Sequence, residues 1–312
     1  MPIIHHDIAA LRTALQPYRG QKNIEQGSLQ RIALVPTMGN LHEGHLELVK
    51  IAKQHADVVV VSIFVNPTQF GVGEDFDSYP RTLDEDVKKL TTVDADYVFA
   101  PSIDEMYPVL PPPTSVLAGP ITAQLCGQSR PGHFDGVGIV VSKLFNIVQP
   151  DVAVFGQKDY QQLAIIKQLV RDLSYPIEII GAPIVRAKDG LALSSRNQYL
   201  STIERQTAPI LYQELQRLAH QLKSSELNHQ SIESLLAQTV ARISDAGFII
   251  DYLDIKTDDL NSVRVDSTNF QTESAQTDSF NVERKDLIIL VAAWLGRARL
   301  LDNQLVMADE PL

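Results

Sequence analysis

The alternation of strand-like and helix-like stretches constrains this chain most. Residues 31–37 form a short apolar run, and residues 41–56 carry apolar side chains at helical spacing. Residues 57–67 are β-branched and apolar on both faces, as in a strand buried inside a parallel sheet. Together these stretches predict a βαβ unit, in which a helix joins two parallel strands.

The same pattern continues along the first part of the chain. Helices are predicted over 83–93, 136–150 and 158–173, and strands over 95–101, 151–156 and 177–185. Such alternation favours an α/β fold with an open, mainly parallel sheet that helices cover on both faces. We expect this sheet to form a larger domain over residues 1–183.

The second part of the chain is patterned differently. Residues 202–222 and 229–246 are predicted helices, and 248–255 and 286–296 are predicted strands. Strict alternation is lost, which favours a smaller α+β domain over residues 184–312. Residues 257–285 are rich in Ser, Thr, Asn, Gln and Asp and predict a long mobile surface loop.

Composition and charge narrow the class of function. A net charge of −11 and the lack of a dense Lys/Arg run argue against a nucleic-acid partner. No apolar stretch reaches the roughly 18–20 residues that span a bilayer, and no signal peptide is recognisable. The single cysteine, Cys126, suits a reducing compartment and is expected to be a small buried hydrophobe. We therefore expect a cytoplasmic protein without membrane or nucleic-acid partners.

The stretch PTMGNLHEGH, residues 36–45, joins the first predicted strand to the first helix. His42 and His45 are three residues apart, whereas zinc proteases use H-E-x-x-H. A zinc site is one reading, and a plain helix start with surface histidines is another. The third is a nucleotide site, because a helix amino terminus after a parallel strand attracts phosphates and both imidazoles can donate hydrogen bonds. Gly39 would relax the turn, and Gly44 would let a ligand approach the backbone.

The stretch FGQKDYQQL, residues 155–163, follows a predicted strand of the same sheet. Ligands of open α/β sheets bind at the carboxyl ends of the strands. Lys158 is therefore placed for a phosphate, and Gln162, one helical turn on, can point the same way. The alternative is a solvated pair of Lys158 and Asp159 in a turn.

The stretch ALSSRNQYLS, residues 192–201, combines phosphate-binding groups with a helix cap. Ser194, Ser195 and Arg196 can grip phosphates, and a polar turn is the alternative. We expect Ser201 to be only an N-cap, with Glu204 completing a capping box.

Two further stretches carry side chains suited to substrate groups. Asn66 and Gln69 follow the strand over 57–67, and Gln69 is a candidate for a substrate hydroxyl or carboxylate. Arg130 and His133 flank a Pro-Gly turn and are candidates for binding an anion. The alternatives are a turn that satisfies its own backbone and a solvated arginine.

Taken together, five stretches resemble the pantoate–β-alanine ligase (pantothenate synthetase) family: PTMGNLHEGH, FVNPTQF, RPGHFDGV, FGQKDYQQL and LALSSRNQYLS. The similarity runs to about residue 256 and resumes near residue 286. HEGH is also similar to the HIGH-type signature of the nucleotidyltransferase superfamily, and SSR occupies the place of its second phosphate-binding motif. The stretch over 257–285 is longer than the family pattern.

The resemblance implies a two-step reaction. Pantoate attacks the α-phosphate of ATP to give pantoyl adenylate and pyrophosphate, and β-alanine then displaces AMP to give pantothenate. It also implies a Rossmann-like first domain, a second domain that acts as a lid, and a homodimer. Mg²⁺ is expected to accompany ATP, held mostly by phosphates and water, and Asp86 is the candidate protein ligand.

The resemblance also implies roles for individual residues, with His45 as proton donor and Lys158 neutralising phosphate charge. The residues expected to act in catalysis are His42, His45, Lys158 and Arg196. The residues expected to bind ATP are Met38, Gly39, Asn40, Leu41, His42, Glu43, Gly44, His45, Gly156, Gln157, Lys158, Asp159, Val185, Leu193, Ser194, Ser195 and Arg196. The residues expected to bind substrate are Gln69 for pantoate and β-alanine, Gln162 for pantoate, and Asn66, Arg130 and His133.

Two other functions compete with the ligase. Another adenylyl- or cytidylyltransferase on this fold would share HEGH but would not need Gln69 and Gln162 together. A non-catalytic nucleotide-binding protein would be expected to lack one of the phosphate-contacting side chains, and all of them are present.

Overall fold

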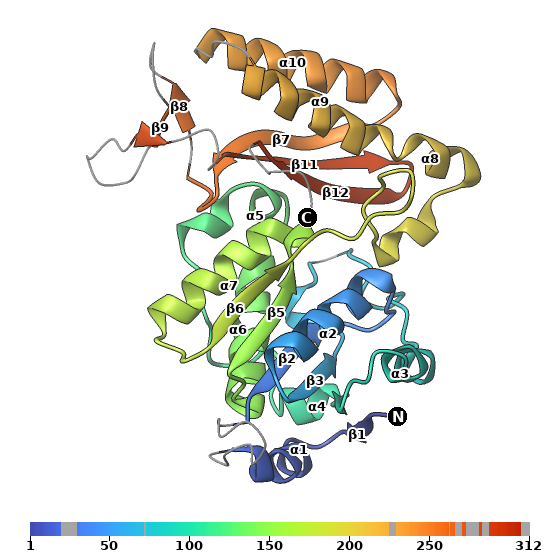
Figure 1. The fold of residues 1–312 in the computed structure, drawn as a ribbon, viewed down its shortest axis with the longest axis vertical. Helices are drawn as coiled ribbons and strands as arrows, with labels where there is room; N and C mark the ends of the chain where they lie inside the picture. Colours follow the sequence, from blue (N-terminus) through green and yellow to red (C-terminus); the bar gives the residue numbers. More distant parts are fainter. Residues whose placement is uncertain are drawn as a thin grey trace. The chain divides into compact units, whose positions relative to one another are not determined.

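The structure, a computed structural model, describes residues 1–19, 30–71, 73–224, 229–261, 263–265, 270–272, 281–282 and 287–306. The chain divides into two compact units, each with a sheet of its own (Figure 1). The first unit comprises Met1–Gln157 and Gln161–Val185, and the second comprises Lys158–Tyr160 and Arg186–Leu312.

The first unit is built on a six-stranded sheet in the order β1-β4-β3-β2-β5-β6, and every neighbouring pair is parallel. This confirms the predicted parallel sheet. Its strands are β1 Ile3–His5, β2 Ile32–Thr37, β3 Val58–Ile63, β4 Tyr97–Phe99, β5 Val152–Gly156 and β6 Glu178–Ala182.

Helices cover both faces of this sheet. On one face, Val49 of α2 (Glu43–His55) packs in one apolar cluster with alternate residues of β2, β3 and β5. Phe145 of α6 (His133–Val148) contacts Phe155 of β5. Val154, the residue before Phe155, belongs to the cluster packed against α2. Because successive strand residues point to opposite faces, α2 and α6 must lie on opposite sides.

The order of the strands reverses between β2 and β5. β3 and β4 lie on one side of β2, whereas β5 and β6 lie on the other. Ligands of open α/β sheets bind at the carboxyl edge beside such a reversal. Residues 38–45 follow β2, residues 64–69 follow β3, and Gln157 follows β5, so three predicted site stretches leave the sheet at this edge.

The remaining elements of the first unit are short or peripheral. Its other helices are α1 Ile8–Leu15, α3 Leu83–Thr91, α4 Ile103–Met106, α5 Cys126–Ser129 and α7 Tyr160–Asp172. Its 3₁₀ turns are η1 Gln16–Tyr18, η2 Pro67–Gln69 and η3 Pro120–Ala123, while η4 Gln157–Asp159 lies where the units divide. The sequence pattern predicts neither β1 nor α1, since a three-residue strand and a two-turn helix show little periodicity.

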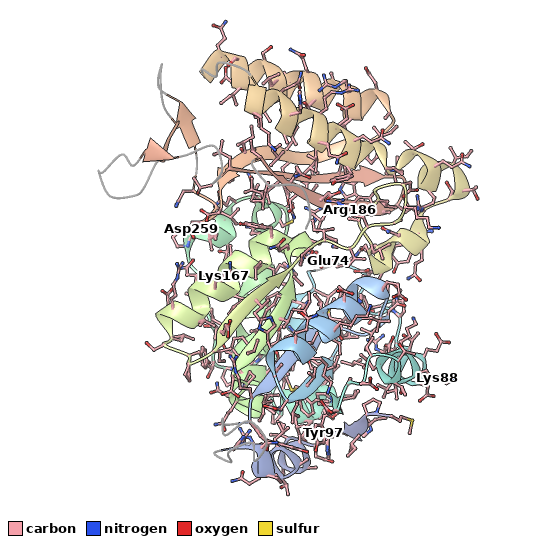
Figure 2. All side chains as sticks on the ribbon, in the orientation of Figure 1. Glu74, Lys88, Tyr97, Lys167, Arg186 and Asp259 are labelled. Carbon is pink, nitrogen blue, oxygen red and sulfur yellow. The ribbon has the colours of Figure 1, made fainter. Side chains whose placement is uncertain are left out.

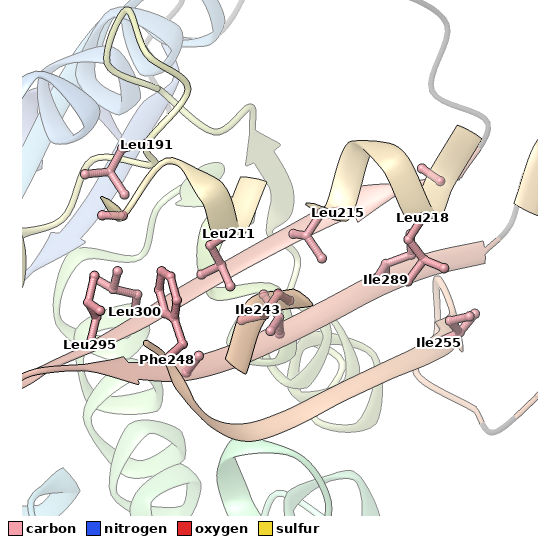
Figure 3. Close-up of a cluster of buried hydrophobic side chains, with 14 of the residues drawn as sticks. Leu191, Leu211, Leu215, Leu218, Ile243, Phe248, Ile255, Ile289, Leu295 and Leu300 are labelled. Atoms are coloured by element: carbon pink, nitrogen blue, oxygen red, sulfur yellow. The ribbon is translucent and has the colours of Figure 1, made fainter. Parts of the chain in front are cut away.

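The second unit places two helices on an antiparallel sheet in the order β12-β11-β7. Leu215, Ile243 and Ile289 are fully buried between them (Figure 3). The strands are β7 Ile249–Thr257, β11 Leu287–Leu295 and β12 Ala298–Leu305, and the helices are α9 Ile210–Ser224 and α10 His229–Asp245.

Several predictions for this unit need correction. The helix predicted over 202–222 is two helices, α8 Thr202–Thr207 and α9, because Pro209 has no backbone N–H with which to continue the helical hydrogen bonds. Within 257–285, residues 258–261 lie outside any strand, but the prediction of a loop is wrong at three short stretches. These form a second antiparallel sheet of β8 Val263–Val265, β9 Phe270–Thr272 and β10 Asn281–Val282. The remaining residues of the predicted loop, 262, 266–269, 273–280 and 283–285, lie outside the described part of the chain.

Boundaries shift by a few residues elsewhere. The strand predicted over 57–67 is β3, which ends at Ile63, and the strand predicted over 177–185 ends at Ala182. The helix predicted over 136–150 begins earlier, at His133. No element is predicted from the sequence over residues 298–305, which form β12. Among the described helices, none combines the length and the apolar character that crossing a bilayer requires.

Candidate active site

A buried carboxylate holds the turn that follows β2. Gly39 and Asn40 have φ values of 83° and 49°, in the left-handed region that favours glycine. Asp86 of α3 is fully buried and accepts hydrogen bonds from the backbone N–H groups of Asn40 (2.9 Å) and Leu41 (2.8 Å). Lys89, also on α3, donates to the carbonyl of Leu41 at 2.6 Å. Helix α3 therefore fixes the path of the chain into α2.

These contacts bear on the predicted magnesium ligand. The Asp86 carboxylate also accepts a hydrogen bond from the Thr82 hydroxyl at 3.1 Å, so donors of the protein engage both of its oxygens. Mg²⁺ demands near-octahedral coordination and usually keeps several waters, which a carboxylate enclosed in this way does not favour. The surroundings of Asp86 favour support of the turn over metal binding.

His42 and His45 together form the first turn of α2. Nδ1 of His42 accepts from the Gly44 N–H at 3.1 Å, and Nδ1 of His45 accepts from the His42 N–H at 3.2 Å. This is a capping box made by two histidines, so the predicted helix start is confirmed. A neutral imidazole that accepts at Nδ1 carries its proton on Nε2. In both rings, whose centroids lie 4.1 Å apart, Nε2 is therefore the nitrogen that carries the N–H.

The zinc reading finds no support. Among the residues that the structure describes, no group of three or more His, Cys, Asp or Glu side chains is placed to hold a metal ion. His42 and His45 alone supply fewer than the three protein ligands that a catalytic zinc ion commonly has. A helix start that donates N–H groups to an anion remains, and it fits the nucleotide reading.

Gln69 lies in contact with the motif after β2. Its Nε2 is 3.1 Å from Sδ of Met38, and its Oε1 accepts from Nδ2 of Asn66 at 3.1 Å. Asn66 is buried and also donates to the carbonyl of Gly136. A Cβ on Gly136 would lie 2.1 Å from the Thr68 carbonyl oxygen, so only glycine allows α6 to approach this turn. Asn66 thus orients the amide of Gln69 so that its N–H₂ group faces Met38.

Arg130 and His133 contact the main chain of Gln69. His133 Nδ1 lies 2.7 Å and Arg130 Nη2 lies 3.4 Å from the Gln69 carbonyl oxygen. Glu74, labelled in Figure 2, forms a bidentate pair with Arg130 at 2.7 and 2.6 Å. Burial would raise the pKa of Glu74, but the hydrogen bonds and charge of Arg130 outweigh it and lower that pKa. Since Glu74 already neutralises Arg130, the arrangement favours support of Gln69 over anion binding.

Helix α7 holds its neighbouring loop through Gln161, which the sequence analysis passed over. The Gln161 amide donates to the carbonyls of Ile121 (2.9 Å) and Gln124 (2.7 Å) and accepts from the Cys126 N–H (3.0 Å). Cys126 is buried, as predicted. Gln162, the predicted pantoate ligand, is half-buried on the same helix.

In the second unit, Lys158 forms a long ion pair with its neighbour. Its Nζ lies 3.3 Å from both carboxylate oxygens of Asp159. The Lys158 side chain is 19% exposed, and that of Asp159 is 45% exposed. A long pair with a half-exposed carboxylate is weak, so a phosphate can compete for the ammonium group.

The stretch after residue 191 contains the predicted cap. The Ser201 hydroxyl accepts from the Glu204 N–H at 3.3 Å, and the Glu204 carboxylate accepts from the Ser201 N–H at 2.7 Å, which confirms the capping box. Ser194 caps the 3₁₀ turn η5 (Ser195–Tyr199) by accepting from the Arg196 N–H. The phosphate contacts of Ser194, Ser195 and Arg196 stay predictions.

The predicted site residues are divided between the two units. Those in the first unit are Met38, Gly39, Asn40, Leu41, His42, Glu43, Gly44, His45, Asn66, Gln69, Asp86, Arg130, His133, Gly156, Gln157, Gln162 and Val185. Those in the second unit are Lys158, Asp159, Leu193, Ser194, Ser195 and Arg196. Within the first unit, the structure brings Met38 into contact with Gln69 across 31 residues of sequence.

Comparisons with known proteins agree with the motifs. The family described as pantoate–β-alanine ligase matches residues 3–305. A pantothenate synthetase of Psychrobacter arcticus is 72% identical over 312 residues, which cover all of both chains. The crystal structure of pantothenate synthetase from Thermus thermophilus is 38% identical with a TM-score of 0.81, covering 98% of this chain and 100% of that one.

A third relative was solved with ligands. The structure of pantoate–β-alanine ligase from Francisella tularensis, complexed with β,γ-ATP and β-alanine, is 32% identical with a TM-score of 0.73 and covers 99% of each chain. Full-length matches at these identities exclude a similarity confined to the nucleotide motif. The chain is therefore a member of the pantoate–β-alanine ligase family of carbon–nitrogen ligases.

Proposed function

We propose that this protein condenses pantoate with β-alanine at the expense of ATP, through a pantoyl-adenylate intermediate. The carrying observation is the first turn of α2, where two imidazoles whose Nδ1 atoms accept backbone N–H groups offer Nε2–H donors at a helix amino terminus. The family membership supports the choice of substrates. The Francisella relative supports ATP and β-alanine as ligands.

In the first step, a pantoate carboxylate oxygen attacks the α-phosphorus, and the bond from that phosphorus to the bridging oxygen of pyrophosphate breaks. Negative charge grows on the leaving pyrophosphate. His42 and His45 stabilise it through Nε2–H, and His45 is the proposed proton donor. Lys158 and Arg196 add positive charge to the phosphates. Mg²⁺ is proposed to accompany ATP, bound mainly by phosphate oxygens and water.

In the second step, the β-alanine amine attacks the acyl carbon, the bond to the AMP oxygen breaks, and the amine loses a proton. Adenylation is needed because a free carboxylate is a poor electrophile. Gln69 is proposed to hold pantoate through the N–H₂ group that Asn66 orients, and Gln162 is proposed as a second pantoate ligand. The remaining groups of the predicted ATP site are proposed to bind the nucleotide.

The cellular setting and the assembly are also proposals. The resemblance supports a cytoplasmic homodimer in which the first unit binds nucleotide and pantoate. It also supports a lid function for the second unit.

The test measures pyrophosphate and AMP after rapid quenching, with ATP, Mg²⁺ and pantoate, in the presence and absence of β-alanine. We expect pyrophosphate release in one turnover without β-alanine, and sustained release of AMP only when β-alanine is added. Release of a nucleotide-containing final product would contradict the ligase and favour another nucleotidyltransferase. Binding of ATP without turnover would contradict catalysis altogether.

The role of Gln69 is tested within the same assay. Gln69→Ala is expected to raise the KM for pantoate by roughly 10-fold, because it removes a hydrogen bond to a charged group. Gln54→Ala, on the exposed surface of α2, is the matched control. Unchanged pantoate kinetics in the Gln69 variant would reject this assignment without affecting the reaction proposed.

A further inference from the structure

Strand β12 carries two adjacent polar side chains that are buried. Asp302 is 4% and Asn303 is 6% exposed. Buried polar groups cost free energy unless they find hydrogen-bond partners, so their partners show what the strand holds. Since neighbouring residues of a strand point to opposite faces, the two side chains support different parts of the second unit.

Asn303 holds the main chain of Lys158. Its Nδ2 donates to the Lys158 carbonyl oxygen at 3.0 Å, across 145 residues of sequence. Lys158 to Tyr160 belong to the second unit, whereas the residues directly before and after them in sequence belong to the first. This hydrogen bond therefore joins the segment Lys158–Tyr160 to the sheet of the second unit.

Asp302 holds a different segment of the same unit. It forms a bidentate pair with Arg186 at 2.7 and 2.8 Å. Arg186, labelled in Figure 2, also donates to the Gly190 carbonyl and lies over the Tyr212 ring, with its Cζ 3.5 Å from the ring centroid. An arginine bound on three sides has little freedom, so the ion pair defines the geometry of the segment that begins at residue 186.

That segment leads directly to the predicted phosphate-binding residues. Arg186 pairs with Ala192 in an isolated β-bridge, and Asn197 donates to the Ala192 carbonyl at 3.0 Å. The turn η5, which contains Ser195 and Arg196, packs against β12. The Lys158 main chain and the turn of Ser195 and Arg196 are thus supported by one strand.

The charges in this region act on one another as well. Burial raises the pKa of Asp302, while the hydrogen bonds and charge of Arg186 and the charge of Lys158 act in the opposite direction. The ammonium group of Lys158 is therefore close enough to interact with the buried carboxylate. A displacement of Lys158 would therefore also change the electrostatic interaction between its ammonium group and the Asp302 carboxylate.

We propose that Asn303 is a positioning residue for Lys158, and that β12 holds Lys158 in register with Ser195 and Arg196 for contact with the phosphates of ATP. The inference rests on the proposed function, which assigns Lys158 to those phosphates. Asn303 itself touches no reacting atom in this proposal. Misplacement of a catalytic group by about 1 Å can cost on the order of 100-fold in rate, so one lost hydrogen bond is enough for a measurable effect.

The test is a double-mutant cycle between Asn303 and Lys158, read as the single-turnover rate of pyrophosphate release from ATP and pantoate. Asn303→Ala is expected to lower this rate by roughly 10-fold in the wild-type background and to have almost no further effect in a Lys158→Ala background. Gln304→Ala is the matched control, because the Gln304 amide donates to the Leu305 carbonyl on the same strand. It should leave the rate and the KM for ATP unchanged.

A second measurement follows the main chain directly. Hydrogen exchange of the peptide that contains Lys158 should become faster in Asn303→Ala but not in Gln304→Ala. If Asn303→Ala fails to fold, Asn303→Asp replaces it in both measurements, since it keeps the shape of the side chain but removes the donor.

Each outcome decides between the proposals. The same loss of rate from the Asn303 substitution with and without Lys158, or unchanged rate and exchange, would overturn the positioning role. A Lys158→Ala variant with full activity would instead overturn the proposed role of Lys158 in catalysis, and the positioning role with it. Faster exchange confined to the Asn303 variant, with a non-additive loss of rate, supports the inference.

Discussion

The two units support their predicted phosphate-binding residues by different means. In the first unit, the histidine bonds that cap α2 join residues two and three positions apart, and α3 holds the preceding turn from 46 residues away. In the second unit, Lys158 and Arg186 are held by β12 across 145 and 116 residues. These bonds span at most 46 residues of sequence in the first unit, whereas in the second unit they reach across more than 100 residues to one strand of the sheet.

This difference has an energetic consequence. A capping box adds modest stability to one helix end, and its loss leaves the rest of the fold intact. Asp302 is buried and the Arg186 side chain is only 16% exposed, so the loss of either partner leaves a largely desolvated charge uncompensated. We therefore expect substitutions in the second unit to act on stability first, and those at the start of α2 to act on chemistry first.

The largest effect on stability is predicted for Asp302→Asn. It leaves Arg186 without its counter-charge and should lower the free energy of unfolding of the second unit by about 3–5 kcal/mol. Trp294, the single tryptophan of the chain, lies on β11 in this unit. Its fluorescence during urea unfolding therefore reports on the second unit separately from the far-ultraviolet circular dichroism of the whole protein.

Two variants serve as controls for that measurement. Asp189 and Arg205 form an exposed pair in the same unit, and Asp189→Asn should cost less than about 1 kcal/mol. Replacing both buried partners, as in Arg186→Met with Asp302→Leu, should recover much of the lost stability. If Asp302→Asn cost no more than Asp189→Asn, the contrast between the units would be wrong.

The next prediction separates chemistry from capping at His45. His45→Ala removes both the imidazole and the cap, and should slow adenylate formation by at least ~100-fold. His45→Gln restores an N3 side chain of the kind that completes capping boxes. It should therefore recover stability while the rate stays low, as measured by thermal unfolding and single-turnover quenching. His55→Ala, at the exposed carboxyl end of α2, is the control.

The outcome has a clear alternative. If His45→Gln restored the rate together with the stability, the imidazole would act only as a cap, and the local support would be the whole contribution of this residue. Loss of rate without loss of stability would sharpen the comparison with the second unit.

The same distinction explains what the sequence could predict. The strands of the parallel sheet, the start of α2 and the cap at Ser201 can each be predicted from the spacing of residues within a short stretch, by periodicity and capping rules. The hydrogen bond from Asn303 to Lys158 depends on the tertiary structure, which no local sequence pattern encodes. The strand that makes it, β12, has two adjacent leucines followed by three polar residues, so it lacks the strict alternation that predicts a half-buried strand.

Candidate residues illustrate both sides. Gln69 is predicted because it follows a buried strand at the carboxyl edge. The sequence also predicts ligand binding by Asn66, Arg130, His133 and Asp86, because it shows the chemistry of a side chain but not its partners. The contacts of Asn66, Arg130 and His133 with Gln69, and those of Asp86 with the turn after β2, depend on the fold.

A smaller loss of stability is predicted for Asp86→Asn. The amide cannot accept with both atoms, so one of the backbone N–H groups of Asn40 and Leu41 loses its acceptor. We expect a loss of about 1.5–3 kcal/mol that does not depend on Mg²⁺, measured by urea unfolding in its presence and absence. Glu85→Gln, a neighbour on the same helix, should have little effect. A wild-type KM for ATP restored by raising Mg²⁺, with unchanged stability, would favour the metal-ligand reading instead.

The smallest effects compare the units at alkaline pH. Burial and the hydrogen bond with Tyr18, together with the charge of Asp96, raise the pKa of Tyr97 in the first unit to about 12. Burial with the charges of Asp258 and Asp259 raises the pKa of Tyr160 in the second unit to about 12. Unfolded tyrosine ionises near pH ~10, so the stability that each provides below that pH is lost as pH rises through about 12. Tyr97→Phe and Tyr160→Phe should each flatten this part of the pH profile of the unfolding free energy. Carboxylates contribute to both shifts, Asp96 at Tyr97 and Asp258 with Asp259 at Tyr160, so added salt should reduce both effects. Effects that do not change with salt at either tyrosine would contradict the assigned charges.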